Sequence, residues 1–593
     1  MRNPTLLTME GIEAVKGLMN VSMGKEKADL SIINANVLNV YTGEILEGHS
    51  ISVKGDWIAY TGNEPDGTIG EDTRVIDAGG KVIIPGFIDG HTHLADCFYH
   101  PSEFLGFVMA RGTTTIITET IEPFPIMGYE GIMDFLAALR EQPIKIFATI
   151  PAMVSTSRGL KPPSQEEMKR LLSREDILGL GESYWQAVIR EPDRFLPNFF
   201  ETLMFGKRLE GHSAGAKEKK LMAYVVPGIT SCHEPINAEE ALERLRLGLY
   251  VMVREGSIRR DLKSISKIMV SGMDTRRIIL VSDGIGPKDI LKMGYMENIV
   301  QTAIDLGIDP VNAIRMVTLN VAEYFHLDGI TGGIAPGKHA DMLILPDIET
   351  MRAEYVLSRG KIIAREGDLL IPPKKYTFSD RSLHSVSFRR ELTPSDFAIN
   401  LKRKVSHIRV RIIEQATDLV TREFRASVPV TRGEIRANVE EDILKVAAID
   451  RAISPGKMFV GLIRGFRLTG GALACSSAWD TSDIIVIGAD DEDMAHAVNH
   501  IYSLQGGALV CLKGEILNEI PLPIFGLMSD LSMEDLVRKY NEMTETIKAL
   551  GVPFTDPLRT LITLTGAAIP FLRICEEGLV DIKNGKTVDF IVS

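Results

Sequence analysis

Residues 82–93 of the chain read VIIPGFIDGHTH, an apolar run that leads through Asp89 and Gly90 into two histidines, His91 and His93. The apolar run predicts a buried strand. Side chains at positions i and i+2 of an extended strand point to the same side, so the two imidazoles can converge on one metal ion. A lone His-x-His pair is common by chance, and its meaning depends on the chain around it.

From this first run onwards, the chain alternates repeatedly between a β-rich run and a helical stretch. Eight such units within about 250 residues are the period of a (β/α)8 TIM-like barrel. The eight β-rich runs are Val82–Ile88, Thr114–Thr118, Ile144–Ile150, Ile177–Gly181, Arg208–Glu210, Ile229–Ser231, Tyr250–Arg254 and Ile278–Ser282. We therefore predict an α/β fold whose barrel covers residues 81–330.

Shorter strands flank the predicted barrel on both sides. Residues 28–80 and 331–370 alternate short β-rich runs with turn residues, which predicts a small β-sandwich built from both segments. Residues 371–593 open with a linker, Pro372–Lys375, and then mix strand-like and helical runs, which indicates a C-terminal α/β (α+β) domain. Residues 1–27 are left as an N-terminal extension.

Composition limits the classes of function. The net charge of −13 disfavours nucleic-acid binding, which depends on Lys and Arg neutralising phosphates. No run approaches the roughly 18 apolar residues needed to span a bilayer, and residues 1–27 lack the pattern of a signal peptide. Five scattered cysteines without a Cys-x-x-Cys pair indicate neither disulfide nor thiolate chemistry. We expect a cytoplasmic protein with no membrane and no nucleic-acid partner.

Four further polar residues sit just past predicted barrel strands, where the strands of such a barrel open onto one face. They are Glu122, His212, His233 and Asp283. Taken alone, Glu122 or Asp283 reads as a capping residue, but four histidines at strand ends of one barrel favour a metal site. Together with His91 and His93 they make four imidazoles and two carboxylates, which suit two divalent ions rather than one zinc. Ligands of this kind admit Mn, Fe or Zn.

The chain resembles the adenine deaminases of the amidohydrolase superfamily from about residue 28 to its end. The blocks that carry the resemblance are Pro85–His93, Gly112–Thr115 leading to Glu122, Gly179–Glu182, Gly211-His212, Cys232–Glu234, Arg254–Ser257, Ser282-Asp283, Thr318–Glu323, Gly337–Asp341, Asp490–Ala495, Pro521–Ile524 and Gly526–Asp530. The resemblance implies that two metal ions are bound by His91, His93, Glu122, His212, His233 and Asp283. It favours Mn or Fe over Zn as these ions. It also implies that Asp283 shuttles the proton while adenine and water become hypoxanthine and ammonia.

Residues around the implied ligands depart from the family pattern. Ala95 stands where the family has Glu, and a second Asp after Asp283 is replaced by Gly284. Three further departures are replacements within short family motifs. Ile121 replaces the His of an Asp-Pro-His-Glu string, Tyr295 replaces the His of a Gly-His pair, and Trp479 replaces the first His of a His-Asp-Ser-His string. Groups that read a purine edge discriminate strongly between substrates, so these departures bear on the substrate.

Glu182, at the end of the fourth predicted strand, is our candidate for a catalytic carboxylate that faces the substrate; a structural salt bridge is an equally open reading. The expected partners are a purine base, water and a second copy of the chain in a homo-oligomer, as a dimer. Two alternatives stay open. The same chemistry can act on another aminopurine or on a cyclic amide or amidine, or the chain can bind metal without turnover.

Overall fold

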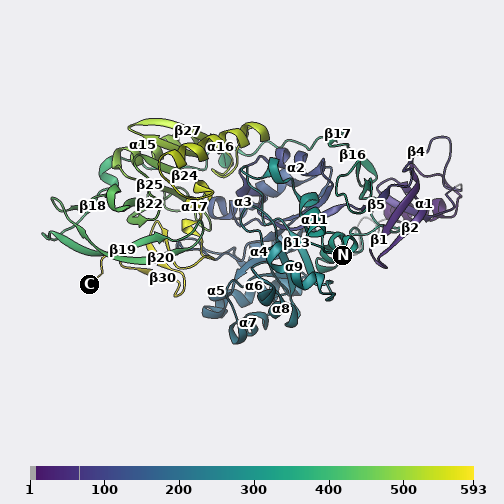
Figure 1. Ribbon diagram of the computed structural model, residues 1–593, viewed down its shortest axis with the longest axis horizontal. Helices are drawn as coiled ribbons and strands as arrows, with labels where there is room; N and C mark the ends of the chain where they lie inside the picture. The colour runs from purple at the N-terminus through teal and green to yellow at the C-terminus, as the bar shows by residue number, and fades with distance from the viewer. Residues whose placement is uncertain (1–8, 66, 593) are drawn as a thin grey trace.

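The structure is a computed structural model that describes residues 9–65 and 67–592. Figure 1 shows an elongated molecule with three parts in a row. The C-terminal domain lies at one end, the predicted barrel region in the middle, and a flanking sheet with helix α1 (Met9–Ser22) at the other end. The predicted extension, residues 1–27, thus holds a helix, whereas its residues 1–8 lie outside the described part of the chain.

A parallel array of eight strands, counted over the described residues, forms the middle of the molecule and pairs as one sheet of five strands and one of three. Its strands are β6 (Phe87–Thr92), β7 (Thr113–Thr118), β8 (Lys145–Ile150), β9 (Ile177–Tyr184), β10 (Arg208–His212), β11 (Ser231–Cys232), β12 (Tyr250–Arg254) and β13 (Ile278–Val281). Strands β6 to β10 pair in sequence order, as do β11 to β13. Thr230 N donates to Leu209 O at 3.0 Å, and Asp283 N donates to His91 O at 3.1 Å. The parallel sheet therefore curls back towards its first strand, as in a TIM-like fold.

Helices alternate with these strands, as the sequence predicted. They are α2 (Pro101–Met109), α3 (Pro123–Leu139), α4 (Gln165–Leu172), α5 (Trp185–Arg190), α6 (Pro192–Met204), α7 (Glu218–Val225), α8 (Ala238–Arg246), α9 (Leu262–Val270), α10 (Ile290–Met293), α11 (Met296–Asp305), α12 (Pro310–Arg315) and α13 (Leu319–Tyr324). Apolar side chains of β6, β7, β9, β12 and β13 form one buried cluster with residues of α13. This cluster supports the strands whose carboxyl ends carry the polar side chains described below.

The prediction of one continuous strand over residues 82–88 is wrong. The run breaks at Gly86 into β5 (Val82–Pro85), which belongs to the flanking sheet, and β6. A Cβ at Gly86 would lie 2.3 Å from Oγ1 of Thr114, so only glycine lets the chain pass this close to β7 as it changes sheets. The predicted strand over residues 229–231 is also displaced, to the two residues of β11.

The flanking sheet combines segments from both sides of the barrel region. Its strands, besides β5, are β1 (Leu30–Asn39), β2 (Glu44–Lys54), β3 (Trp57–Gly62), β4 (Arg74–Asp77), β14 (Met342–Leu345), β15 (Tyr355–Ser358), β16 (Lys361–Arg365) and β17 (Asp368–Leu369). β14 pairs antiparallel with β5, which joins residues 342–345 to residues 82–85. Leu18 and Val21 of α1 pack against this sheet in a cluster with Trp57.

The C-terminal domain is built on a mostly antiparallel sheet, the α+β form of the two that the sequence left open. The strand order is β20-β19-β23-β22-β25-β24-β26-β27. These strands are β19 (His407–Gln415), β20 (Thr421–Pro429), β22 (Leu444–Asp450), β23 (Met458–Arg464), β24 (Ala472–Cys475), β25 (Asp483–Gly488), β26 (Gly507–Leu512) and β27 (Glu515–Pro521). The smaller strands are β18 (Ile399–Asn400), β21 (Glu434–Ile435), β28 (Leu572–Cys575), β29 (Gly578–Asp581) and β30 (Lys586–Val588).

Helices α14 (Asp380–Leu383), α15 (Asp491–Leu504), α16 (Met533–Ala549) and α17 (Pro557–Ile562) complete this domain. The predicted linker is docked just past the end of α3, because Lys374 N donates to Gln142 Oε1 at 2.9 Å and Gln142 Nε2 donates to Lys374 O at 3.0 Å. Tyr376 adds a bond from its hydroxyl to Asp134 Oδ1 at 2.7 Å. The C-terminal domain is thereby fixed against the barrel region.

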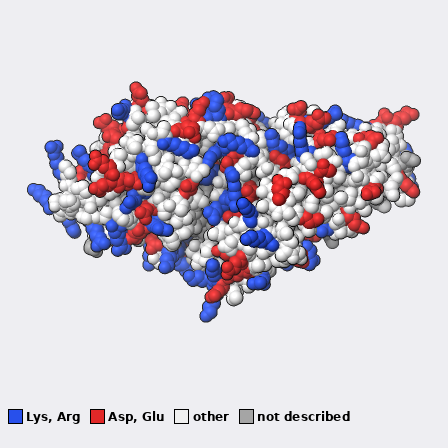
Figure 2. Space-filling view, in the orientation of Figure 1, with Lys and Arg blue, Asp and Glu red and all other residues white. Residues whose placement is uncertain are grey.

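The surface mixes charges of both signs. Figure 2 shows Lys and Arg side chains interspersed with Asp and Glu over the face that it draws. No helix within residues 9–65 and 67–592 has the length and apolar character that a bilayer span requires.

Candidate metal centre

The predicted site residues all lie at the carboxyl ends of the curled sheet. His91 is on β6 and His93 directly follows it; Glu182 is on β9, His212 ends β10, His233 directly follows β11, Asp283 lies two residues past β13, and Glu122 directly precedes α3. Residues from six strand ends, spread over nearly 200 positions, therefore meet at one face.

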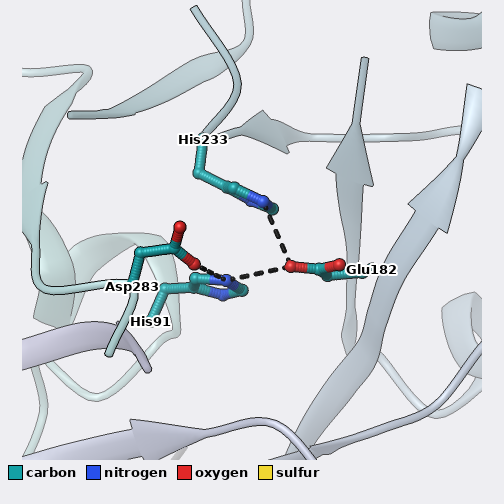
Figure 3. A group of neighbouring side chains, drawn as sticks. All are labelled: His91, Glu182, His233 and Asp283. Carbon is teal, nitrogen blue, oxygen red and sulfur yellow. Dashed lines mark ion pairs between the residues drawn. The ribbon is translucent and has the colours of Figure 1, made fainter. Parts of the chain in front are cut away.

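Glu182 lies at the centre of this group. Its Oε1 is 3.1 Å from Nε2 of His93, 3.1 Å from Nε2 of His233 and 3.3 Å from Nε2 of His91. Its Oε2 is 3.4 Å from Nδ1 of His212. Figure 3 shows the carboxylate of Glu182 directed between the rings of His91 and His233. Burial alone would raise the pKa of Glu182, but the adjacent His233 and His212 hold that pKa well below its usual range. The carboxylate is therefore ionised and within reach of all four imidazoles.

Asp283 approaches the same imidazoles from the opposite side (Figure 3). Its Oδ1 is 3.4 Å from Nε2 of His91 and 3.5 Å from Nε2 of His93, and its Oδ2 is 3.4 Å from Nη1 of Arg254. Burial opposes ionisation of Asp283, but His91, His93 and Arg254 lower its pKa well below the usual value. Its backbone φ of 54° falls in the left-handed region, a conformation that recurs at functional sites.

Glu122 does not join the donor atoms that face Glu182. Its Oε1 lies 2.6 Å from Nδ1 of His93, which is the ring nitrogen turned away from Glu182. An imidazole that binds a metal through one nitrogen commonly gives its other N–H to a carboxylate. Glu182 therefore lies among the imidazole nitrogens, and Glu122 lies on the opposite side of the His93 ring.

Several buried donor atoms of the group have no hydrogen-bond partner among the described residues. They are Nε2 of His91, Nδ1 of His212, Oε2 of Glu122 and both carboxylate oxygens of Glu119 and Glu210. Buried polar atoms are normally paired, since leaving one unpaired costs about 1–3 kcal/mol. Unpaired imidazole nitrogens that converge with ionised carboxylates are the chemistry of a divalent-cation site, so the residues present fit such ions.

Three carboxylates of the site were not identified from the sequence. Glu119 Oε1 lies 3.7 Å and Glu210 Oε2 lies 3.4 Å from Nδ1 of His91, and Glu234 Oε1 lies 3.4 Å from Nε2 of His233. Burial raises the pKa of Glu119 to about 8. Glu210 could have been found from the period of two in a strand, because it precedes His212 by two residues on β10 and so shares its side.

A buried arginine joins two of the strand ends. Arg254, on β12, forms an ion pair with Glu234 and a second one with Asp261 at 3.0 Å. Burial alone would lower the pKa of Arg254, but the surrounding carboxylates raise it. Arg254 is therefore a fixed positive charge beside Asp283, and it orients both Glu234 and Asp283.

A cavity of about 320 Å³ opens over this group of side chains. Its wall from the barrel region includes His93, Glu182, His212, His233, Arg254 and Asp283, with Ile121 and Tyr184. The C-terminal domain supplies Leu419, Val420, Trp479, Asp480, Ala568, Ile569 and Pro570. The cavity thus lies between two domains and is large enough for a small planar ligand.

The five departures from the family pattern fall in different places. Ile121 and Trp479 line the cavity. Tyr295 donates from its hydroxyl to Asp89 Oδ2 at 2.5 Å and so ties α11 to the segment before His91. Ala95 is buried, and a Cβ at Gly284, whose φ is 94°, would lie 3.3 Å from Sγ of Cys97. The cavity wall itself has therefore changed at two positions.

Comparison with known proteins assigns the family. Residues 82–363 match the model of the amidohydrolase family, and residues 418–586 match that of the adenine deaminase C-terminal domain. An adenine deaminase of Moorella thermoacetica is 36% identical over 587 residues, which are 98% of this chain and 98% of the relative. An adenine deaminase of Cenarchaeum symbiosum is 34% identical over 595 residues, which are 98% of this chain and 95% of the relative. The chain belongs to the adenine deaminase family.

The resemblance predicted from the sequence is confirmed. Among solved structures, a β-aspartyl dipeptidase from Fervidobacterium islandicum is 15% identical with a TM-score of 0.46, over 59% of this chain and 99% of that one. The amidohydrolase match and the cluster of His, Glu and Asp side chains together indicate divalent metal ions as cofactors of this adenine deaminase family member.

Proposed function

We propose that this protein hydrolyses adenine to hypoxanthine and ammonia. Relatives called adenine deaminase, from bacteria and an archaeon, align with this chain over nearly its full length. One structural observation supports the reaction most directly: ligand atoms of His91, Glu182, His233 and Asp283 all lie within 4.8 Å of one another, and the last three of these residues line the cavity. The substrate is a small purine base, and the second reactant is water.

We further propose that the curled sheet is a closed (β/α)8 barrel over residues 81–330, flanked by the β-sandwich of residues 28–80 and 331–370. The backbone bonds from Thr230 and Asp283 support closure, since they join β10 to β11 and β13 to β6. The C-terminal domain then covers residues 371–593 and forms the roof of the cavity.

The residues that would hold the metal ions are His91, His93, His212, His233, Asp283 and Glu182. The position of the two Glu182 oxygens among four imidazoles supports this role in place of the substrate-facing one expected from the sequence. Glu122 is retained as the partner that orients His93 through Nδ1. Mn and Fe suit these nitrogen and oxygen donors, and Zn is also admitted by them.

Two divalent ions bound here would make hydroxide available near neutral pH by lowering the pKa of water towards ~7. Asp283 is the proton carrier of the reaction. As an ionised carboxylate at the cavity floor, it accepts a proton from the attacking water and delivers it to the amino nitrogen as that group leaves C6 of adenine. Arg254 keeps Asp283 ionised before the transfer and orients it.

Ammonia release from adenine is the test of this proposal. Protein loaded with Mn, Fe or Zn is incubated with adenine, other aminopurines and cyclic amides, and ammonia and ultraviolet absorbance are measured. We expect adenine to give the highest kcat/KM. Faster turnover of another amine or amide would assign the same site to that substrate, and metal-loaded protein inert towards the whole panel would make the chain a binding protein.

The metal assignment has a separate test. Glu182→Gln should lower the bound metal measured by elemental analysis, whereas a substrate-facing Glu182 would leave metal content unchanged and raise KM. The homodimer and the cytoplasmic location expected from the sequence stay predictions, which light scattering and cell fractionation test.

A further inference from the structure

The C-terminal domain sends one short loop into the cavity. This loop connects β24 to β25, and its consecutive residues Trp479 and Asp480 both line the cavity. Neither belongs to the metal-binding group. They are therefore candidates for contacts to a bound ligand rather than to the ions.

Each of the two side chains is anchored beside a segment that carries a metal-binding residue. Trp479 Nε1 donates to Asp96 Oδ1 at 3.1 Å, and Asp96 lies three residues past His93. Tyr184 donates from its hydroxyl to Asp480 Oδ1 at 3.0 Å, and Tyr184 lies two residues past Glu182. The loop thus spans the gap between the ends of β6 and β9, and one hydrogen bond holds it to each of them.

The loop backbone is held as firmly as its side chains. Trp479 N donates to Ile562 O at 3.1 Å, and Trp479 O accepts from Thr565 Oγ1 at 2.6 Å. Asp480 O accepts from Ser155 Oγ at 2.6 Å. Asp480 has a φ of 61°, in the left-handed region, so these bonds hold a non-glycine residue in an uncommon conformation. Such strain persists where the surroundings enforce it, which is frequent at ligand-binding positions.

The carboxylate of Asp480 can accept more hydrogen bonds than the protein donates to it. Oδ1 accepts from Tyr184, and Oδ2 accepts from Ala567 N at 2.8 Å. Burial raises the pKa of Asp480 to about 7, and the ionised carboxylate offers about four acceptor positions, of which the protein uses half. Since Asp480 lines the cavity, the others are available to an N–H group of a ligand.

Trp479 forms part of an apolar wall. Ile121, Leu419, Ile569 and Pro570 line the same cavity. The hydrogen bond to Asp96 fixes the indole in one orientation, so a flat ligand can pack on it with little loss of side-chain freedom. Stacking of a nucleobase on an aromatic side chain changes affinity by about 5- to 150-fold when the ring is removed.

We propose that Trp479 and Asp480 determine specificity for the free purine base: the indole of Trp479 packs against the purine face, and the carboxylate of Asp480 accepts the N–H of the imidazole ring. This inference rests on the proposed function. With the amino-bearing carbon at the metal centre, the imidazole edge of the purine is directed towards the roof that Asp480 helps to form. A nucleoside or a 9-alkylated base has no N–H at the substituted nitrogen and leaves the carboxylate unpaired, which sites of this kind reject strongly.

The first test measures steady-state kinetics with adenine and with 9-methyladenine. Asp480→Ala should raise KM for adenine at least 10-fold and shrink the ratio of the two kcat/KM values at least 10-fold, because the variant no longer requires the N–H. Asp480→Asn, which keeps a carbonyl acceptor of the same shape, should fall between the two proteins. An unchanged ratio in Asp480→Ala would overturn the assignment of Asp480.

The second test separates stacking from a structural role of Trp479. Trp479→Ala should raise KM for adenine by about 5- to 150-fold with a smaller change in kcat, and Trp479→Phe should recover most of that loss. The control is Tyr376→Phe, which removes another contact between the domains, the bond to Asp134, away from the cavity. If Trp479 served only to hold the domains together, Trp479→Ala and Tyr376→Phe would both lower Tm and leave KM alone.

Binding without turnover distinguishes failure of this inference from failure of the proposed function. Hypoxanthine should quench the intrinsic fluorescence of the protein, which has three tryptophans: Trp57, Trp185 and Trp479. The quenching should be lost in Trp479→Phe and kept in Trp185→Phe. If the wild-type protein releases ammonia from adenine and hypoxanthine still quenches the fluorescence of Trp479→Phe, the stacking contact alone is refuted. If the wild-type protein releases no ammonia, the proposed function is refuted.

Discussion

The two ends of the curled sheet both hold buried charges, but they pair them differently. At the amino ends of the strands, Lys145 Nζ lies 2.7 Å from Asp341 Oδ2, and Asp341 also accepts from Thr331 Oγ1 at 2.9 Å and from Arg359 N at 3.0 Å. At the carboxyl ends, several imidazoles share one carboxylate instead: His91 Nε2 lies 3.3 Å and His212 Nδ1 lies 3.4 Å from the oxygens of Glu182, which also faces His93 and His233. One base paired with one acid serves the fold, whereas several imidazoles gathered around the same carboxylates are the donor set of a divalent-cation site.

The largest expected effect at the carboxyl ends is loss of catalysis. Asp283→Asn keeps an oxygen donor at the same place but cannot accept a proton from water. We expect kcat for adenine to fall by about 10³-fold or more, while the protein still binds metal and its Tm changes little. Ammonia release and elemental analysis of the same sample measure both quantities.

Retained turnover in Asp283→Asn would remove the proton-carrier role, and loss of metal together with activity would make Asp283 chiefly a ligand. Asp341→Asn is the matched variant at the other end. It should lower stability and leave kcat of the folded enzyme near the wild-type value.

At the opposite end, the expected effect is on folding. Lys145→Met leaves Asp341 buried without its charge partner, and removing one member of a buried pair costs about 3–5 kcal/mol. Chemical denaturation should show that loss, with kcat unchanged in the folded fraction. The double variant Lys145→Met/Asp341→Asn should regain part of the stability. A single variant as stable as wild type would show that the pair contributes nothing.

The sequence predicted which residues lie at the ends of the strands better than it predicted the contacts between their side chains. Alternation of β-rich and helical runs located the curled sheet, and His91, His93, His212, His233 and Asp283 meet at its carboxyl ends because each lies at or just past the end of a strand. The roles of Glu122 and Glu182 were not predictable in this way, since strand position does not tell which side of a histidine ring a carboxylate faces.

The contribution of the C-terminal domain to the cavity could not be predicted from the sequence either. Trp479 and Asp480 lie nearly 200 residues beyond Asp283, and no periodicity in the chain indicates that their loop reaches the cavity. The sequence marked the position only as a departure from the family pattern.

A smaller effect is expected behind the imidazole rings. Glu122→Gln keeps a polar side chain beside Nδ1 of His93 but removes the charge that orients the ring, and such partners typically change metal affinity by about 10- to 100-fold. Competition with a metal chelator measures the change. The control is Glu130→Gln, at an exposed position of α3. If Glu122 were itself a metal ligand, its loss would remove one ion from the site, and elemental analysis would show that stoichiometry.

Glu297, at the start of α11, tests a third arrangement, a buried carboxyl with incomplete pairing. Its Oε1 accepts from Tyr295 N at 3.0 Å and lies 3.6 Å from Nε of Arg111, while its Oε2 has no partner in the described residues. Burial raises the pKa of Glu297 to about 7. The folded state therefore holds the proton more tightly than the unfolded state, in which the pKa is about 4.3.

A raised carboxyl pKa makes stability fall as pH rises from about 4.5 to about 7, because in that window the unfolded chain ionises first. Glu297→Gln cannot titrate, so its free energy of unfolding relative to wild type should increase by about 1–3 kcal/mol between pH 4.5 and pH 8. Urea denaturation at the two pH values measures this difference, with Glu130→Gln as the exposed control. A relative stability independent of pH would mean that Arg111 balances the charge fully, and Glu297 would then resemble the matched pair of Lys145 and Asp341 rather than the unmatched donors of the metal centre.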